Sequence, residues 1–297
     1  MDGLETRELR YFVAVAEELH FGRAAERLQM AQPPLSRAIR RLERRLGVQL
    51  LNRDNRGVSL TPAGETLLKE ARRALDAVDA AVRRTRRAAM AKPTLVLTTK
   101  AGASHALLKE LLDAYAARPG AVEIDVLLCE IGEQRGLLLN GQADVAIMHA
   151  PFDLMTGLES VEILTEGQVA ILPRSHPLAR RSTLTMAEVS NVPDLPMARW
   201  PRHDFTYPPG PGPEVRSQSQ LAQLVALGRT LLVIPASSRA WQWPEHVAVP
   251  VTDAPLATTL LAWPAGVQSP ALAGLIETAK EVSERLAKDP LDVLGVR

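Results

Sequence analysis

Apolar residues near the N-terminus recur every three or four positions, which is the spacing of helices with one buried face. One such pattern is formed by Leu9, Phe12, Val13 and Ala16, a second by Phe21, Ala24, Ala25 and Leu28, and a third by Leu35, Ile39, Leu42 and Leu46. Pro33-Pro34 suits the first turn of the third helix, and Gly47 is placed to end it. We therefore expect three helices, followed by a hairpin whose strands lie at residues 48–51 and 58–60, with a turn at residues 55–57.

A longer apolar pattern follows the hairpin. Thr61 precedes Pro62 as a helix cap precedes a first helical residue. The residues Leu68, Ala71, Leu75, Val78 and Val82 then follow at alternating spacings of three and four. Because no glycine interrupts residues 65–92, the sequence predicts one long helix that pairs two subunits. An amphipathic helix packed on its own domain is the alternative interpretation of the same pattern.

The remaining sequence alternates short apolar runs with helical patterns. Strands are expected at residues 94–98, 122–128 and 143–148, and helices at 104–117 and 134–139, which favours a parallel sheet covered on both faces. A second lobe is expected from about Glu162, with strands at 169–172 and 231–234 and a helix at 220–227, before a return to the first lobe near Leu256. The predicted domains are residues 1–61, 62–92 and 93–297, the last divided into lobe 1 (93–161 and 256–297) and lobe 2 (162–255).

Charge is distributed unevenly along the 297 residues, although the formal net charge is only +1. Residues 1–92 hold 19 lysines and arginines against 12 acidic residues, and residues 23–56 alone hold nine arginines. Such a local excess favours phosphate backbones, whereas the rest of the chain has an acidic excess, so the two parts are expected to meet different partners. No apolar run approaches the roughly 18 residues of a membrane span, and the N-terminus has no export pattern, so we expect a cytoplasmic protein without a membrane partner.

The single cysteine, Cys129, has no partner for a disulfide within one chain. A buried apolar role is favoured for it over a sensor thiol.

The third predicted helix carries the candidate nucleic-acid chemistry. Its non-apolar face holds Ser36, Arg37, Arg40, Arg41, Arg44 and Arg45. In helix-turn-helix domains the N-terminal side chains of the second helix of the motif meet base edges in the major groove, so Gln32, Ser36, Arg37 and Arg40 are the predicted base-facing residues. Arg53 and Arg56 of the hairpin are predicted to hold phosphates. A small three-helix unit with merely solvated arginines remains the alternative on periodicity alone.

Several motifs in this region resemble the N-terminal domain of LysR-type transcriptional regulators. They are Leu9-Arg10-Tyr11-Phe12-Val13, Phe21-Gly22-Arg23-Ala24-Ala25, Gln32-Pro33-Pro34-Leu35-Ser36-Arg37, Leu46-Gly47-Val48-Gln49-Leu50 and Leu60-Thr61-Pro62-Ala63-Gly64. Later segments, among them Glu130-Ile131-Gly132, Asn140-Gly141-Gln142-Ala143-Asp144, Ser175-His176-Pro177-Leu178 and Ile234-Pro235, resemble the effector domain of the same family. Pro34, Leu51 and Arg229 depart from the usual family pattern, and Arg229 puts a local turn and nearby ligand contacts in doubt.

The resemblance implies an α/β protein with an all-α-type N-terminal domain: a winged helix-turn-helix, a long coiled-coil linker helix and a two-lobed effector domain with a periplasmic-binding-protein fold. It implies a dimeric or tetrameric, sequence-specific DNA-binding regulator that is modulated by a small molecule between the lobes. The expected partners are double-stranded DNA, an effector and, as a candidate, RNA polymerase; no cofactor or metal is expected. The expected DNA-binding residues are Arg23, Gln32, Pro33, Pro34, Ser36, Arg37, Arg40, Arg53 and Arg56.

Effector-binding candidates follow from motif position, because ligands of this fold lie near loops after strands and at helix N-termini. They are Lys100, Gly102, Ala103, Ser104, Glu133, His149, Trp200, Pro201, Arg202 and Asp204. Two structural alternatives stay open: Lys100 and Glu133 as an exposed ion pair, and His149 as a hydrogen-bonded core residue.

Other classes of protein are disfavoured by missing features. The sequence has no Gly-x-Ser-x-Gly, P-loop, His-Glu-x-x-His, cysteine-pair metal site or dinucleotide fingerprint, which argues against an enzyme. A freestanding solute-binding protein would carry an export segment in place of an arginine-rich N-terminal domain. An architectural DNA-binding protein would have little use for a large α/β part. Effector-independent regulation remains an alternative.

Overall fold

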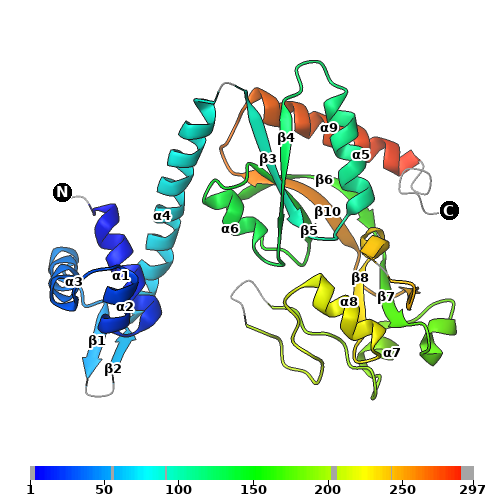
Figure 1. Cartoon of the computed structure of the whole chain (residues 1–297), viewed down its shortest axis with the longest axis horizontal. Coiled ribbons are helices and arrows are strands. Elements are labelled where there is room, and N and C mark those ends of the chain that lie inside the picture. Colours follow the sequence, from blue (N-terminus) through cyan, green and yellow to red (C-terminus); the bar gives the residue numbers. More distant parts are fainter. Residues whose placement is uncertain (1–3, 55–56, 91, 202–205, 242, 289–297) are drawn as a thin grey trace. The chain divides into compact units, whose positions relative to one another are not determined.

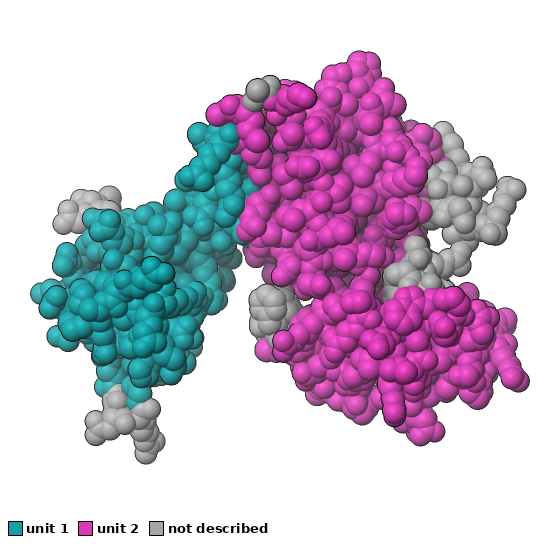
Figure 2. All heavy atoms as spheres, viewed as in Figure 1, with its two compact units in different colours: residues 1–86, 139–141 teal, residues 87–138, 142–297 magenta. Residues whose placement is uncertain are grey.

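The computed structural model describes residues 4–54, 57–90, 92–201, 206–241 and 243–288. It divides into two compact units, residues 1–86 with 139–141 and residues 87–138 with 142–297 (Figure 2). Within the described ranges, no helix is long and apolar enough to cross a membrane.

Three helices form the start of the first unit, as the periodicity predicted (Figure 1). They are α1 (Thr6–Glu18), α2 (Phe21–Arg27) and α3 (Gln32–Leu46). Their apolar faces enclose one core, in which Phe12, Ile39 and Leu42 have no exposed surface. Gly47 ends α3 with a φ of 70°, a backbone conformation that costs glycine less than other residues.

A two-stranded antiparallel hairpin follows α3, and we call it the wing. Its strands are β1 (Leu51–Asp54) and β2 (Gly57–Leu60), with Leu51 opposite Leu60. The first strand starts three residues later than expected, since the Leu50 and Leu51 amides donate to the Glu43 carboxylate of α3 at 3.0 and 3.2 Å. Residues 55–56, with the predicted phosphate contact Arg56, lie outside the described residues.

The long helix α4 (Pro62–Ala88) begins where Thr61 predicted, because the Thr61 hydroxyl accepts from the Gly64 amide at 3.0 Å. It ends at Ala88, four residues before the expected Lys92. Leu68 packs against the core of α1 to α3, whereas Val82 remains 45% exposed. The start of α4 is therefore packed on its own unit, and its far end presents apolar surface.

Gly64 is required by the approach of α4 to the wing. A Cβ atom at this position would lie 2.1 Å from the Leu50 carbonyl oxygen, which is fixed backbone. We therefore expect Gly64→Ala to lower the free energy of unfolding of the N-terminal unit by about 1–3 kcal/mol through overpacking. Denaturant unfolding measures the loss, and Gly136→Ala is the matched control, because a Cβ there meets nothing within 4 Å. Equal effects of the two changes would contradict the steric explanation.

The second unit contains two lobes (Figure 1). The sheet of lobe 1 has the order β4-β3-β5-β10-β6. Its strands are β3 (Thr94–Lys100), β4 (Glu123–Cys129), β5 (Val145–Ala150), β6 (Leu158–Glu166) and β10 (Ala257–Pro264). The strand β3 is parallel to β4 and β5, but β10 is antiparallel to both β5 and β6. The expected parallel sheet is thus correct for three strands only, because β10 enters from lobe 2 without a crossover helix.

Helices cover both faces of this sheet, and β5 shows why. Val145 and Ile147 belong to a core with α5 (His105–Ala116) and α9 (Pro270–Lys288), while Ala146 and Met148 face a second core with α6 (Gln134–Leu139). Because successive strand residues point to opposite faces, a continuous apolar run marks a strand buried on both sides.

Lobe 2 is built on a three-stranded antiparallel sheet, β8-β7-β9. Its elements are β7 (Gln168–Pro173), η1 (Pro177–Arg180), α7 (Met186–Ser190), α8 (Gln218–Ala226), β8 (Leu232–Pro235), η2 (Ala236–Trp241) and β9 (His246–Val251). The expected start of this lobe near Glu162 is too early, since β6 continues in the sheet of lobe 1 to Glu166. At the unusual Gly228-Arg229-Thr230 turn, Gly228 has a φ of 66° and the Thr230 hydroxyl donates to the Pro196 carbonyl at 2.7 Å.

Cys129 ends β4 as a buried residue, and its thiol lies 3.5 Å from the Thr99 carbonyl oxygen. Burial raises the pKa of this thiol above its usual value, which disfavours the reactive thiolate. The buried, unreactive role predicted for Cys129 agrees with this environment.

Candidate functional site

The candidate DNA-binding surface is the exposed face of α3. Gln32, Arg37 and Arg40 are exposed, while Leu35 and Ile39 on the opposite face anchor the helix in the core. The Arg40 guanidinium donates to the hydroxyl of Ser36, one helical turn earlier, at 3.3 Å. The other N–H donors of this guanidinium remain available. The predicted Pro33 and Pro34 lie in the first turn of α3. The structure therefore places these predicted residues together in the first part of α3.

Two of the other predicted arginines, Arg23 and Arg53, have partners inside the domain. Arg23 donates to the Glu18 carboxylate at 3.3 Å and to the Glu18 carbonyl at 2.5 Å. Arg53 lies 3.3 Å from the Glu43 carboxylate and stacks over the Phe21 ring, 4.7 Å from its centre. Both side chains remain partly exposed, so phosphate contact by either one requires sharing or exchanging these internal partners.

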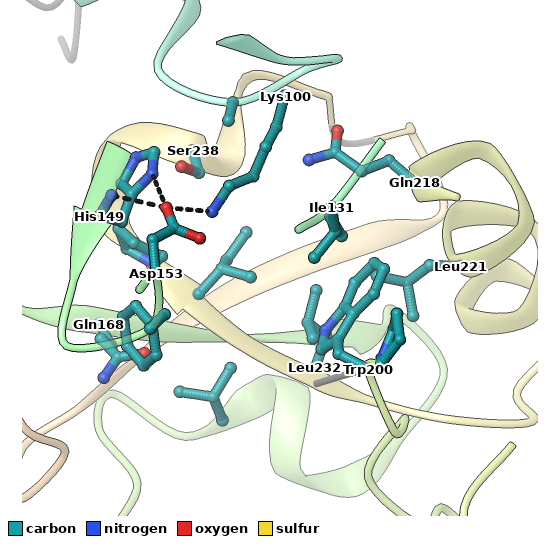
Figure 3. Close-up of a pocket in the computed structure, with 16 residues that line it drawn as sticks. Lys100, Ile131, His149, Asp153, Gln168, Trp200, Gln218, Leu221, Leu232 and Ser238 are labelled. Atoms are coloured by element: carbon teal, nitrogen blue, oxygen red, sulfur yellow. Dashed lines mark hydrogen bonds and ion pairs between the residues drawn. The ribbon is translucent and has the colours of Figure 1, made fainter. Parts of the chain in front are cut away.

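The second candidate site is a cavity of about 310 Å³ in the second unit, lined from both lobes (Figure 3). Lobe 1 contributes Lys100, Ala103, Ile131, His149, Phe152 and Asp153, and lobe 2 contributes Gln168, Trp200, Pro201, Gln218, Leu221, Leu232, Val233, Ile234, Pro235 and Ser238. On the lobe 1 side, most lining residues lie at strand ends or in the loops that follow them, which is the usual place for ligands in open α/β folds.

A buried ion pair lies on the lobe 1 side of this cavity. Lys100 Nζ is 2.8 Å from Asp153 Oδ2, and the two side chains are only 11% and 7% exposed. The same carboxylate oxygen accepts from the His149 amide at 2.8 Å, which fixes Asp153 just after β5. The alternative ion pair between Lys100 and Glu133 does not form, because the exposed Glu133 carboxylate accepts from the Glu130 amide instead.

His149 is held behind the ion pair. Its Nε2 lies 2.9 Å from the Ser104 hydroxyl, and its Nδ1 is buried without a hydrogen-bond partner among the described residues, 3.9 Å from Asp153 Oδ2. Burial, with a further contribution from the positive charge of Lys100, lowers the pKa of His149 to about 3. The imidazole is therefore neutral at physiological pH. Ser104 is completely buried and presents no nucleophile to the cavity.

Of the ten predicted effector-binding residues, the structure brings five to the cavity: Lys100, Ala103, His149, Trp200 and Pro201. Gly102, Ser104 and Glu133 do not line it: Gly102 is exposed in the turn after β3, Ser104 is buried under that turn, and Glu133 faces solvent. Arg202 and Asp204 lie outside the described residues.

Sequence reasoning missed several lining residues. Asp153 was missed although it follows His149 by four residues, because its partner Lys100 lies on another strand. Gln218 is the first residue of α8, and Gln168 is the first residue of β7. These positions were the only feature of the sequence that pointed to them as lining residues. The strand end at Ile234-Pro235 had been noticed as a family motif but not as a ligand-facing one.

The neutral state of His149 predicts a pH effect on stability. In the unfolded chain this histidine titrates near pH 6.5, and in the folded chain near 3, so its contribution is complete above pH 6.5 and is lost as the pH falls toward 3. We expect the free energy of unfolding to fall by about 1.4 kcal/mol per pH unit from this group between pH 6 and pH 4. Denaturant unfolding of the chain and of His149→Gln over this range measures it. Equal slopes for the two proteins would contradict the prediction.

Comparisons with known proteins identify the family of both parts of the chain. Residues 6–65 match the family described as bacterial regulatory helix-turn-helix protein, lysR family, and residues 88–284 match the LysR substrate binding domain. The regulator AlsR of Bacillus subtilis is 33% identical over 80% of this chain and 82% of its own length, and the Hca operon transcriptional activator HcaR of Escherichia coli is 32% identical over 96% and 99%.

Among solved structures, that of the LysR family transcriptional regulator CbnR is similar, with a TM-score of 0.61, 26% identity, and coverage of 94% of this chain and 99% of that one. Full-length CbnR in complex with its target DNA gives a TM-score of 0.58 at the same identity, over 94% and 100%. These relatives are regulators and not enzymes. The chain belongs to the LysR family of DNA-binding transcriptional regulators, with an N-terminal helix-turn-helix and a C-terminal effector-binding domain.

Proposed function

We propose that this regulator binds a roughly two-fold DNA site by placing the start of α3 in successive major grooves. Gln32, Ser36, Arg37 and Arg40 read base edges, with Pro33 and Pro34 shaping the approach of the helix. Arg23, Arg53 and Arg56 hold phosphates. The observation that carries this assignment is the exposed arginine face of α3 above a fully apolar opposite face. An operator on the chromosome would place the chain in the cytoplasm, as the sequence predicts.

A small molecule in the cavity modulates DNA binding in this proposal. The cavity takes residues from both lobes, so a ligand that contacts both stabilises one lobe arrangement over another. A ligand shifts such an equilibrium only by its difference in affinity for the two states. The bound and free forms then differ in subunit geometry and DNA bending, through which contact with RNA polymerase is altered.

The regulator acts as a dimer or tetramer, and β4 supports a pairing surface in addition to α4. This strand forms one edge of the lobe 1 sheet, and its residues Val126, Leu127 and Leu128 are 41%, 36% and 59% exposed. An exposed apolar sheet edge favours pairing with another chain, and a second copy provides the same surface in return.

Leu128→Glu tests this surface. We expect the substitution to raise the dissociation constant of the oligomer by about 10- to 100-fold, because a carboxylate replaces buried apolar contact at the interface. Sedimentation velocity over a concentration series gives the constant. The control is Leu227→Glu, since Leu227 is an equally exposed leucine (64%) at the end of α8 in lobe 2. An unchanged assembly in Leu128→Glu would exclude β4 from the interface.

Footprinting on the DNA flanking the regulator's own gene, at several salt concentrations, tests the proposed function. We expect protection of an interrupted inverted repeat and a steep loss of affinity with salt, since each phosphate contact releases counterions. A change in the footprint with a small molecule supports effector control, whereas protection that no compound changes supports effector-independent regulation. Absence of sequence-specific protection at every salt concentration would contradict the assignment of the α3 surface.

A further inference from the structure

The charges of the cavity lining cancel within the described residues. Lys100 and Asp153 are the charged side chains of this lining, and they are paired at 2.8 Å in a nearly dry environment. His149 adds no charge at neutral pH, because burial keeps it deprotonated. A carboxylate ligand would therefore have to separate a formed ion pair or enter without a counter-charge, and either course carries a large desolvation cost.

Helix N-termini are the other common source of positive potential for anions. The helix α5 starts at His105 and none of its described residues lines the cavity, so its first amides are not aimed at a ligand there. The helix α8 does reach the cavity through Gln218 and Leu221, but its start is already capped, since the Ser217 hydroxyl accepts from the Gln220 amide at 3.2 Å.

Apolar side chains make up most of the remaining lining (Figure 3). Trp200, Leu221 and Leu232 lie together on the lobe 2 side, and Ile131 lies near them from lobe 1. These side chains fit a flat or branched hydrocarbon body, whose transfer from water is favourable in proportion to the apolar area buried.

Two polar atoms in residues of the lining are left without a partner within the described part of the chain, His149 Nδ1 beside Asp153 and the side-chain oxygen of Gln218. Gln218 Oε1 is buried and accepts no hydrogen bond within the described part of the chain. A buried acceptor without a donor is costly, and a ligand that supplies an N–H or O–H group removes this cost. Gln218 Oε1 itself has almost no accessible surface, so the Gln218 amide must turn to meet a ligand whose polar group lies at the start of α8.

We propose that the cavity takes an uncharged ligand with an aromatic or branched aliphatic body and one N–H or O–H donor, which binds Gln218 Oε1. This inference rests on the proposed function, since it names the chemical class of the effector. The volume of about 310 Å³ is near the lower limit of ligand pockets, so the ligand has about ten to fifteen non-hydrogen atoms. A carboxylic acid of the same shape is rejected at neutral pH.

Matched acid and amide pairs test the ligand class on the full chain. Benzoate with benzamide, phenylacetate with phenylacetamide, and cinnamate with cinnamamide differ in charge but hardly in shape. Binding is followed by isothermal titration calorimetry and by Trp fluorescence, since Trp200 lines the cavity. We expect at least one amide to bind about tenfold or more tightly than its acid. If only acids bind, the inference is overturned while effector control stands; if no member of any pair binds, the inference is overturned and effector control is decided by the footprint alone.

Substitution of Gln218 tests the donor contact. Gln218→Leu keeps a side chain of similar size and removes the acceptor. We therefore expect it to lower the affinity for the amide ligand about tenfold. The N,N-dimethyl form of the same amide has no donor and should bind the parent chain and Gln218→Leu alike. Circular dichroism verifies that Gln218→Leu is folded. An amide that binds Gln218→Leu as tightly as the parent chain would overturn the contact, even where the preference for neutral ligands holds.

Discussion

Replacing both Arg37 and Arg40 with alanine is expected to weaken specific DNA binding at least about 100-fold. Each arginine that contacts a guanine through two hydrogen bonds contributes about 1–3 kcal/mol of discrimination, and both lie exposed in the first half of α3. Neither has an ion-pair partner assigned within the described residues, so their removal costs the fold little. Fluorescence anisotropy on the footprinted site and on random DNA, at one salt concentration, measures affinity and selectivity together.

Arg44→Ala is the matched control for this variant. Arg44 is an exposed arginine of the same helix, but it lies seven residues after Arg37, about 10 Å further along the axis. We expect Arg44→Ala to lower the affinity by less than about threefold, and by the same factor for the footprinted site and for random DNA. If Arg44→Ala lowers the specific affinity as much as the double variant does, the arginines act only through their total charge, and the base-reading assignment is wrong.

The N-terminal unit was predicted well because its signals are local. Pro33, Gly47 and Thr61 each fix a helix boundary through their own backbone or side chain, and the structure places boundaries at all three. The partners of Arg53 were not predictable in this way, because Phe21 and Glu43 are brought to it by folding. A sequence does not show whether an arginine is available to bind phosphate, because a carboxylate or an aromatic ring of the same domain can bind its guanidinium instead.

The second unit shows the limit of periodicity. The strand β6 was missed because Leu158–Glu166 is largely polar and half exposed, with Ile163 as its one buried residue among those described. Strands of this kind are specified by pairing with neighbours, here β10, which is distant in sequence. The same reason explains why lobe 2 was assigned a start near Glu162.

A cavity between the lobes was expected from the sequence, but only part of its lining was. Lys100 and His149, which were selected by motif position, both line the cavity, since the carboxyl ends of β3 and β5 meet at one sheet edge. Glu133 was selected for its motif, yet its side chain turns back to the Glu130 amide. Side-chain direction in loops depends on local hydrogen bonds that spacing does not reveal.

The largest stability effect is expected from Asp153→Asn. The amide keeps an acceptor for the His149 N–H but leaves Lys100 as an unpaired cation in a site where its side chain is 11% exposed. Removing one partner of a buried ion pair typically costs about 3–5 kcal/mol. All four tryptophans lie after residue 199, so Trp fluorescence during urea unfolding of the full chain reports on the second unit. A loss below about 1 kcal/mol would mean that water reaches Lys100.

Two comparisons separate charge burial from other causes in this experiment. Asp113→Asn breaks a Lys–Asp pair with Lys109 of the same type, but those side chains are 70% and 63% exposed, so the expected loss of stability is small beside that of Asp153→Asn. Adding Lys100→Met to Asp153→Asn removes the stranded charge and should restore at least half of the lost stability. If the double variant is as unstable as Asp153→Asn, the lost stability comes from packing around His149 and not from the unpaired charge of Lys100. The ion pair is then not required for the neutrality of the cavity.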